Sequence, residues 1–245
     1  MLKEDHLFAS SSSGRNDFEF NTEVAEVFDD MVARSIPFYV EQQRMIQEIA
    51  RRLSPQGARI YDLGCATATT LINLCGVIPE CAGFIGYDNS PAMLAYARNK
   101  VRDNKFDDRI ELRFGDLNGE LVAHPLENAG LVTLCWTLQF LRPMQRDRVI
   151  RWVYESLPQG GALVMAEKVL TADSRISRLF IDTYYSFKRR NGYSDNEIAR
   201  KREALENVLV PYTISENLEM IRRNGFEVTD TFFQWYNFAA FLCLK

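Results

Sequence analysis

The segment over residues 58–70 constrains the fold of this chain more than any other part of the sequence. An apolar run there ends in an acid, Asp62, and small residues then recur at alternate positions, at Gly64, Ala66 and Ala68. A helical pattern of apolar residues follows directly. A buried strand, a tight turn and a helix, in that order, are typical of the first half of a nucleotide-binding βαβ unit.

A second acid strengthens this interpretation, which the loop alone supports weakly because it departs from the G-x-G-x-x-G spacing. Asp88 ends the next strand-like run, residues 83–87. A carboxylate at that place can accept hydrogen bonds from both ribose hydroxyls of a nucleoside. The alternative is an ordinary α/β turn whose small residues let a helix pack on a strand, and the two acids together favour the nucleotide site.

Composition narrows the possible functions. The 245 residues are 47% hydrophobic, which suits one large α/β domain. The net charge of −4 gives no basic footprint, so we expect no stable nucleic-acid partner. No apolar run approaches the ~18 residues of a transmembrane helix, and the first residues lack the apolar core of a signal peptide. We therefore expect a cytoplasmic protein with no membrane partner.

Cysteine and histidine usage argues against metal chemistry. The five cysteines form no C-x-x-C pair, and one of the two histidines, His6, falls in the polar N-terminal stretch while the other, His124, falls in an expected loop. Reduced thiols in a cytosolic protein explain this pattern best. We expect no metal site and no histidine-dependent triad.

The chain is expected to hold a flexible tail over residues 1–16 and a single domain over residues 17–245. Residues 17–53 are predicted to form a helical lid, broken near Pro37 because the residue before a proline avoids the α-helical region. Strand-like runs then alternate with helical patterns, which predicts a parallel, doubly wound sheet. These runs are residues 58–63, 83–87, 110–114, 130–135 and 161–166.

The last third of the chain breaks this alternation. Residues 171–212 are predicted to form a helical cap, inserted after the fifth strand, that begins with a wide apolar stripe. The members of the stripe are Ile176, Leu179, Phe180, Thr183, Tyr184 and Phe187. Two β-rich runs around residues 236–237 predict a terminal hairpin. The expected fold is α/β, a mostly parallel seven-stranded sheet that ends in an antiparallel hairpin.

A sheet with that ending resembles class I S-adenosylmethionine-dependent transferases, whereas nicotinamide-binding Rossmann domains usually continue with parallel strands. Asp116 and Leu117 follow the third strand, where an acid beside an apolar residue can bind the adenine amino group and cover the ring. The fourth strand lacks the Asn/Asp-Pro-Pro-aromatic box of amino-methylating enzymes. No His or Asp base follows it either, although methyl transfer to a poor nucleophile needs one.

A narrower resemblance covers the chain from about residue 17 to its end. The sequence resembles the carboxy-S-adenosyl-L-methionine synthase family, most specifically in its cap and fourth-strand segments. The matching segments are residues 23–28, 34–39, 61–65, 88–93, 137–141, 160–168, 187–194, 201–208 and 232–238.

The resemblance implies that a carboxyl group passes from prephenate to the methyl carbon of S-adenosylmethionine, releasing phenylpyruvate. A separate enzyme then uses the product to modify the wobble uridine of some tRNAs. The family's carboxylate-binding arginine, the expected catalytic residue, falls on Arg202, and a homodimer that involves the cap is also implied. The cofactor set, for S-adenosylmethionine or its carboxylated product, falls on Tyr39, Gly64, Cys65, Ala66, Asp88, Asn89, Asp116, Leu117, Cys135 and Arg202.

Two departures from the family bear on the activity. Cys135 stands where the family commonly has Asn, and a thiol is a poor substitute for an amide in hydrogen bonding. The loop after Cys65 is one residue shorter than in some members, with Ala66 where Ser is common. An ordinary methyltransferase acting on a small molecule or RNA is therefore the main alternative, followed by a non-catalytic nucleoside binder and, distantly, a nicotinamide oxidoreductase.

Overall fold

The computed structural model describes residues 3–9 and 18–245. Its sheet follows the strand order β3-β2-β1-β4-β5-β8-β7, and a short extra strand, β6, pairs with the end of β5. The bounds are β1 Arg59–Leu63, β2 Gly83–Asp88, β3 Ile110–Phe114, β4 Ala129–Cys135, β5 Ala162–Leu170, β6 Tyr212–Thr213, β7 Val228–Trp235 and β8 Phe238–Leu244. Only β8, paired with β5 and β7, introduces antiparallel contacts. The predicted fold class is confirmed, and β6 is the strand that the sequence did not indicate.

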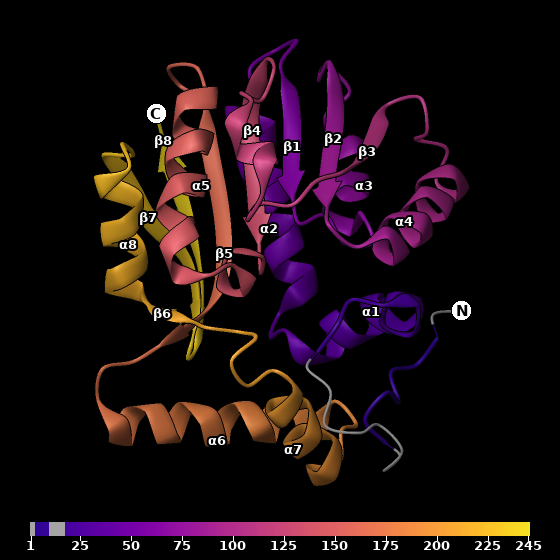
Figure 1. The fold of residues 1–245 in the computed structure, drawn as a ribbon, viewed down its shortest axis with the longest axis vertical. Helices are drawn as coiled ribbons and strands as arrows, with labels where there is room; N and C mark the ends of the chain where they lie inside the picture. The colour runs from indigo at the N-terminus through magenta and orange to yellow at the C-terminus, as the bar shows by residue number, and fades with distance from the viewer. Residues whose placement is uncertain (1–2, 10–17) are drawn as a thin grey trace.

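Eight α-helices surround this sheet in the described part of the chain (Figure 1). Helices α5 and α8 cover one face, and α2, α3 and α4 cover the other. Helices α1, α6 and α7 lie across one end of the sheet. The bounds are α1 Thr22–Ser35, α2 Tyr39–Leu53, α3 Thr69–Cys75, α4 Pro91–Asp103, α5 Pro143–Ser156, α6 Ser174–Arg190, α7 Asp195–Ala204 and α8 Ile214–Arg223.

The core is divided in two by the sheet, as the alternation of side chains along a strand requires. On β1, Tyr61 and Leu63 belong to the cluster under α5 and α8, whereas Ile60 belongs to the cluster under α2, α3 and α4. All three side chains are almost completely buried. This two-sided burial explains the nearly continuous apolar runs of the central strands.

Local signals position the elements that carry the site. Ser90 caps α4 by accepting the Met93 N–H, with Pro91 in the first turn. The lid is interrupted as expected, since α1 ends at Ser35 and α2 begins at Tyr39. Phe38, in the left-handed region at φ 54°, makes the turn between them.

Part of the expected flexible tail packs on the protein, which corrects that expectation for residues 3–9. Asp5 is only 1% exposed. Its backbone carbonyl accepts a hydrogen bond from Arg34 Nη2 at 2.7 Å, and its carboxylate accepts one from the Tyr193 hydroxyl at 2.6 Å. A buried carboxylate with such partners could not be recognised from a polar composition. The rest of the expected tail lies outside the described residues.

Candidate functional site

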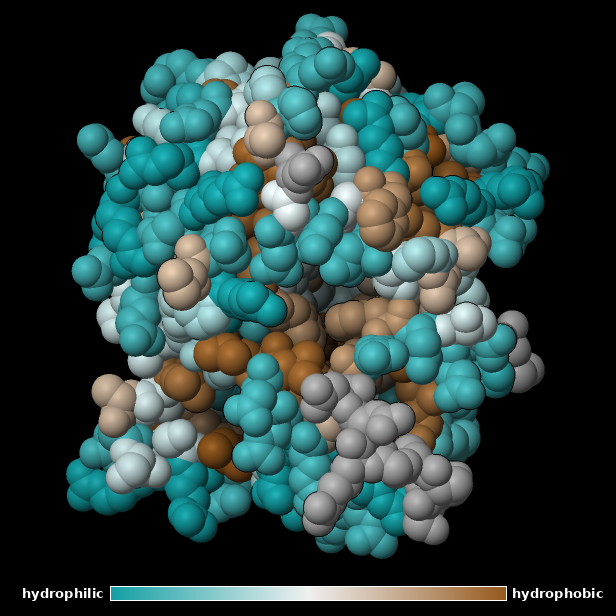
Figure 2. Space-filling view, viewed as in Figure 1, coloured by the Kyte–Doolittle hydropathy of each residue, from teal (hydrophilic) through white to brown (hydrophobic). Residues whose placement is uncertain are grey.

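A cavity of about 250 Å³ opens at the carboxyl ends of the parallel strands. Its walls come from the loops after β1, β2, β3 and β4, from α1 and the start of α2, and from the cap helices α6 and α7. Figure 2 shows a hollow bordered by hydrophobic residues between the sheet-bearing part and the helices below it. Ligands of open α/β sheets bind at this edge.

The loop after β1 brings backbone, rather than side chains, to the cavity. Gly64 has φ +80°, and a Cβ there would clash with the side chain of Thr137, whose Cβ lies 2.9 Å from that position. Ala66 and Ala68 also have positive φ, at 45° and 62°. Glycine is therefore required at position 64, and the two alanines hold a backbone conformation that residues with a Cβ rarely adopt. A ligand can approach the loop closely.

Asp88 joins this loop to the end of β2. Its carboxylate accepts the N–H of Ala66 at 2.9 Å and the N–H of Ser90 at 2.8 Å. Burial raises the pKa of Asp88, and the backbone hydrogen bonds oppose that rise. Each oxygen keeps a lone pair after these bonds, so the carboxylate can still accept two hydroxyl donors from the cavity.

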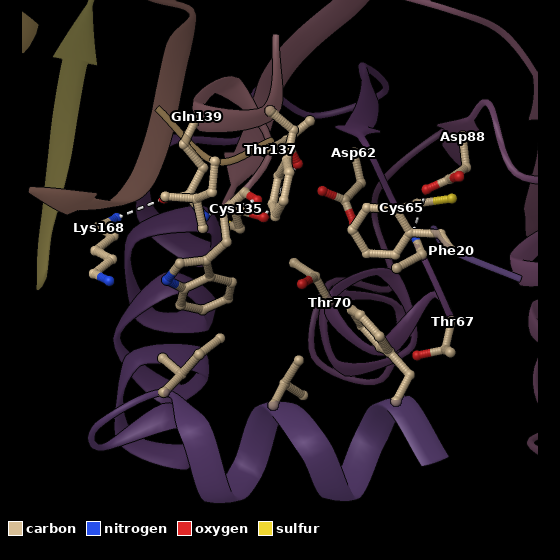
Figure 3. A pocket seen from close by; sticks show the side chains of 18 of the residues that line it. Phe20, Asp62, Cys65, Thr67, Thr70, Asp88, Cys135, Thr137, Gln139 and Lys168 are labelled. Carbon is tan, nitrogen blue, oxygen red and sulfur yellow. Dashed lines mark hydrogen bonds between the residues drawn. The ribbon is translucent and has the colours of Figure 1, made fainter. Parts of the chain in front are cut away.

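Asp62 supplies a second carboxylate at the same side of the cavity, as Figure 3 shows. It is 3% exposed and accepts a hydrogen bond from Thr133 Oγ1 at 2.6 Å. Burial raises the pKa of Asp62 to about 7, and the Thr133 hydrogen bond opposes that rise. A cationic ligand placed nearby would favour its ionised form.

The end of β3 forms a further wall. Asp116 and Leu117 line the cavity with Asn89. Asp116 Oδ1 accepts the N–H of Asn118 at 2.9 Å, which fixes the carboxylate in a turn, and Leu117 is buried. An acid and an apolar side chain are thus presented side by side, as the sequence predicted for an adenine contact.

The loop after β4 is held by a buried glutamate. Glu167, on β5, accepts the N–H groups of Leu138 at 2.9 Å and Gln139 at 3.0 Å. Burial raises the pKa of Glu167 to about 8, and these two hydrogen bonds act in the opposite direction. Cys135, at the end of β4, and Trp136, in the loop, line the cavity. Burial also holds the pKa of the Cys135 thiol well above its usual range, so it is a neutral group here.

Trp136 has an unsatisfied donor in this wall. The residue takes a positive φ of 56°, and its ring packs on Tyr39 with 5.4 Å between ring centroids. Its Nε1–H is buried and has no hydrogen-bond partner among the described residues. A buried donor without a partner is costly, so its position at a cavity points to a ligand acceptor.

The lid covers the cavity through α1 and Tyr39. Met31, Val32 and Ser35 of α1 contribute to the wall. Tyr39 follows at the start of α2, and burial raises the pKa of its hydroxyl. The lid therefore places an apolar surface and one phenol over the loops of the sheet.

The structure brings nine of the ten predicted binding residues to one cavity and leaves one outside. Those lining it are Tyr39, Gly64, Cys65, Ala66, Asp88, Asn89, Asp116, Leu117 and Cys135. Arg202 is exposed on α7 and does not line it, whereas Lys201 is 7% exposed and does. Successive residues of a helix point about 100° apart. The expectation that Arg202 reaches the cavity of its own chain is thus not met by this arrangement.

Several residues of the wall were not identified from the sequence. Thr137, Gln139 and Lys168 follow or face the end of β4, and Tyr184 comes from α6. Figure 3 shows Lys168 on the opposite side of the pocket from Asp62 and Asp88. The segment 137–141 resembles the family in sequence, but the sequence alone gives its residues no chemical role.

Comparisons with known proteins agree with this geometry. Residues 60–161 match the family model described as a methyltransferase domain. The carboxy-S-adenosyl-L-methionine synthase of Methylococcus capsulatus is 49% identical over 245 residues, covering 100% of both chains. That of a Nitratiruptor species is 41% identical over 244 residues, covering 100% of this chain and 99% of the relative.

Solved structures show the same fold at low sequence identity. A putative S-adenosyl-L-methionine-dependent methyltransferase from Methanococcus maripaludis has a TM-score of 0.64 at 16% identity, covering 96% of this chain and 97% of the other. An O-methyltransferase family protein from Burkholderia thailandensis has a TM-score of 0.66 at 14% identity, covering 95% and 65%. These structures show the fold, and the relatives that are 49% and 41% identical show that the chain belongs to the carboxy-S-adenosyl-L-methionine synthase family.

Proposed function

We propose that this protein converts S-adenosyl-L-methionine and prephenate into carboxy-S-adenosyl-L-methionine, phenylpyruvate and water. The observation that carries the proposal is the charge arrangement of one cavity in a member of this family. Asp62 and Asp88 lie on one side, and Lys168 lies on the other (Figure 3). A cationic sulfonium substrate and an anionic carboxyl donor can therefore meet there.

The residues present fit S-adenosylmethionine, which is a substrate of this reaction. Asp88 would accept the ribose hydroxyls, because its carboxylate keeps free lone pairs. Asp116 would accept the adenine amino group and Leu117 would cover the ring. The methionine part would lie against the loop of Gly64, where a Cβ has no room. Tyr39 would cover it from the lid.

The proposed chemistry needs no protein base, which suits this cavity. Neither His6 nor His124 lines it. Prephenate loses its ring carboxyl group as carbon dioxide and its ring hydroxyl as hydroxide, which leaves phenylpyruvate. The hydroxide takes one proton from the methyl group and becomes water. The electron pair of the broken carbon–hydrogen bond then forms the new bond to carbon dioxide. The sulfonium charge favours this step by stabilising the adjacent carbanion.

Cys135 and Ala66 are the two lining residues at which this chain departs from its family, and Cys135 is the one that replaces a hydrogen-bonding amide. A neutral thiol is a weak donor and a weak acceptor. We expect backbone groups of the loop after β4 to take over the contact that an asparagine side chain makes in other members.

Arg202 is proposed to bind the carboxylate of the product from a second copy of the chain. It is exposed on α7, outside its own cavity, and α6 of the same cap exposes Ile176 at 46% and Leu179 at 59%. An apolar surface on that helix would stabilise a homodimer. The guanidinium fork matches a carboxylate geometrically.

The product would be passed to a separate enzyme for wobble-uridine modification of tRNA, and the protein would act in the cytoplasm. Among the helices that the structure describes, none combines the length and apolarity needed to cross a bilayer. The proposal does not require the protein itself to bind tRNA.

Mass spectrometry of the small molecules carried through purification tests the proposed function. We expect a species heavier than S-adenosylmethionine by the mass of carbon dioxide. A protein that carries only S-adenosylmethionine, and yields S-adenosylhomocysteine with every nucleophile tried, would favour the ordinary methyltransferase alternative.

A further inference from the structure

Three lysine ammonium groups gather around two tyrosine rings at one end of the cavity. Lys168 Nζ lies 5.3 Å from the Tyr184 ring centroid, and Lys188 Nζ lies 5.6 Å from the same centroid. Lys188 Nζ is also 5.2 Å from the Tyr193 centroid, and Lys201 Nζ is 5.6 Å from it. Lysines from β5, α6 and α7 thus alternate with two rings. We call Lys168, Lys188 and Lys201 the lysine cluster.

The carboxylates nearby do not balance this charge. Lys201 Nζ donates to Ser35 Oγ at 3.2 Å and lies 3.9 Å from Asp5 Oδ2. That carboxylate also accepts the Tyr193 hydroxyl. In residues 3–9 and 18–245, no carboxylate comes within 4.0 Å of the ammonium group of Lys168 or Lys188, although Lys188 is only 4% exposed.

The pKa values of all three lysines are lowered, chiefly by burial. Burial, with repulsion from Lys201 and Lys168, lowers the pKa of Lys188 to about 7. Burial lowers the pKa of Lys201 to about 8, although Asp5 opposes the change. Burial also lowers the pKa of Lys168. Buried ammonium groups are unfavourable unless anions accompany them.

The cluster opens into the site. Lys168, Lys201 and Tyr184 line the cavity, and Lys188 lies between the other two lysines on the tyrosine rings. Trp136, whose Nε1–H has no partner in the described chain, lines the same cavity. The lysine cluster and the Trp136 Nε1–H are therefore available to one ligand, apart from the aspartates that suit the nucleoside.

We infer that Lys168 and Lys201 form the binding site for the carboxylates of the anionic carboxyl donor, with Lys188 reinforcing the positive potential between them. The ligand class is an organic dicarboxylate, and the inference rests on the proposed function for the identity of that donor, prephenate. A dicarboxylate would complete the ion pairs that the cluster lacks and would accept a hydrogen bond from Trp136.

Lys168→Met and Lys201→Met test this site. We expect the KM for prephenate to rise at least about tenfold in each variant, the size of one lost charge-assisted hydrogen bond. The Kd for S-adenosylmethionine should stay within about twofold, since the lysines lie apart from the ribose and adenine contacts. Lys168→Arg keeps the charge and should recover part of the KM. Lys245→Met is the matched control, because Lys245 lies over the Tyr154 ring at 4.5 Å but outside this cavity.

Proton uptake gives a readout that a purely structural role would not move. Prephenate binding near pH 8 should be accompanied by uptake of protons, because a bound anion raises the lowered pKa values of Lys188 and Lys201. Calorimetric titration of protein loaded with S-adenosylhomocysteine, in buffers of different ionisation enthalpy, measures it. Uptake should fall in Lys201→Met and stay unchanged in Lys245→Met.

The outcomes separate this inference from the proposed function. If the wild-type protein makes the carboxylated product and folded Lys168→Met and Lys201→Met show an unchanged KM for prephenate, the lysine site is overturned and the proposed function stands. A wild-type protein that makes no such product overturns the proposed function. In that case the titration with prephenate decides whether the lysine site exists. Prephenate binding that is weakened in both lysine variants supports the site. Prephenate binding that is weakened in neither variant, or no prephenate binding at all, overturns it. Thermal unfolding confirms that each variant is folded.

Discussion

The Asp29 carboxylate on α1 accepts a hydrogen bond from Thr67 Oγ1 at 2.6 Å. The same carboxylate accepts Thr69 Oγ1 at 3.0 Å and pairs with Lys100 of α4. The lid is therefore fastened to the loop after β1 by one acid. This contact joins α1 to a loop that lines the cavity, in addition to the apolar packing of the lid.

Asp29→Asn should loosen the lid and weaken S-adenosylmethionine binding by about 1–1.5 kcal/mol, because the charge-assisted part of these bonds is lost. Hydrogen exchange in α1 should become faster at the same time. The control is Glu23→Gln, at an exposed position of the same helix. Unchanged affinity together with unchanged exchange would show that the lid does not depend on Asp29.

Asp88→Ala should weaken S-adenosylmethionine binding by about 1.5–3 kcal/mol, the range for hydrogen bonds to a charged group. Calorimetric titration measures this, with the exposed Asp108→Ala as a control. The variant also loses the acceptor for Ala66 and Ser90, so Asp88→Asn separates charge from loop geometry. An unaltered Kd in both variants would remove Asp88 from the site.

Lys188→Met should raise the free energy of unfolding by about 1–3 kcal/mol near pH 6, because a buried ammonium group is replaced by an apolar chain. The folded pKa of Lys188 is lowered to about 7 from 10.5. A base whose pKa is lowered in the folded state binds fewer protons there than in the unfolded state. Its destabilising effect is therefore complete below about pH 7 and fades as the pH rises toward 10.5.

Chemical denaturation across this pH range checks the sign of that effect. The titratable and charged groups around Lys188 are Lys168, Lys201, Asp5, Glu197, Tyr184 and Tyr193. The wild-type protein should gain stability relative to Lys188→Met as the pH rises above 7. A Lys188→Met protein that is less stable than the wild type at pH 6 would contradict the claim that nearby carboxylates do not balance the charge of the lysine cluster.

Arg202→Ala should leave S-adenosylmethionine binding unchanged and weaken binding of the carboxylated product by about 2–5 kcal/mol, if the pair is desolvated. Arg202→Lys should restore only part of this, because an ammonium lacks the two-pronged geometry. Competition between the two ligands measures the difference. Equal losses for both ligands would assign Arg202 to general binding or to folding.

Mixing Arg202→Ala with Asp88→Ala should restore activity if Arg202 serves the cavity of a partner copy. One of the two sites in a mixed dimer then keeps both residues. Light scattering should show a dimer for the wild type, and Leu179→Glu should shift it toward monomers of about 28 kDa. A wild-type monomer at micromolar concentration would exclude the shared site.

The sheet, the lid break and the hairpin could be predicted because their signals are local. The loop spacing predicts the roles of Gly64 and Asp88, and capping chemistry predicts that the Ser90-Pro91 pair begins a helix. The lysine cluster could not, since Lys168, Lys188 and Lys201 come from three elements and meet only through the packing of the cap. Lys201 and Arg202 are neighbours on a polar helix, and which of them faces the cavity depends on the rotation of that helix about its axis. A polar segment has no apolar stripe from which this rotation could be predicted.

Transfer of an isotopic label tests the central claim most directly. Prephenate carrying ¹³C in its ring carboxyl group is incubated with S-adenosylmethionine and the wild-type protein, and the nucleoside products are resolved by mass spectrometry. The account predicts that the label appears in a carboxylated S-adenosylmethionine, together with unlabelled phenylpyruvate. Unlabelled S-adenosylmethionine remaining as the only sulfonium species would contradict it.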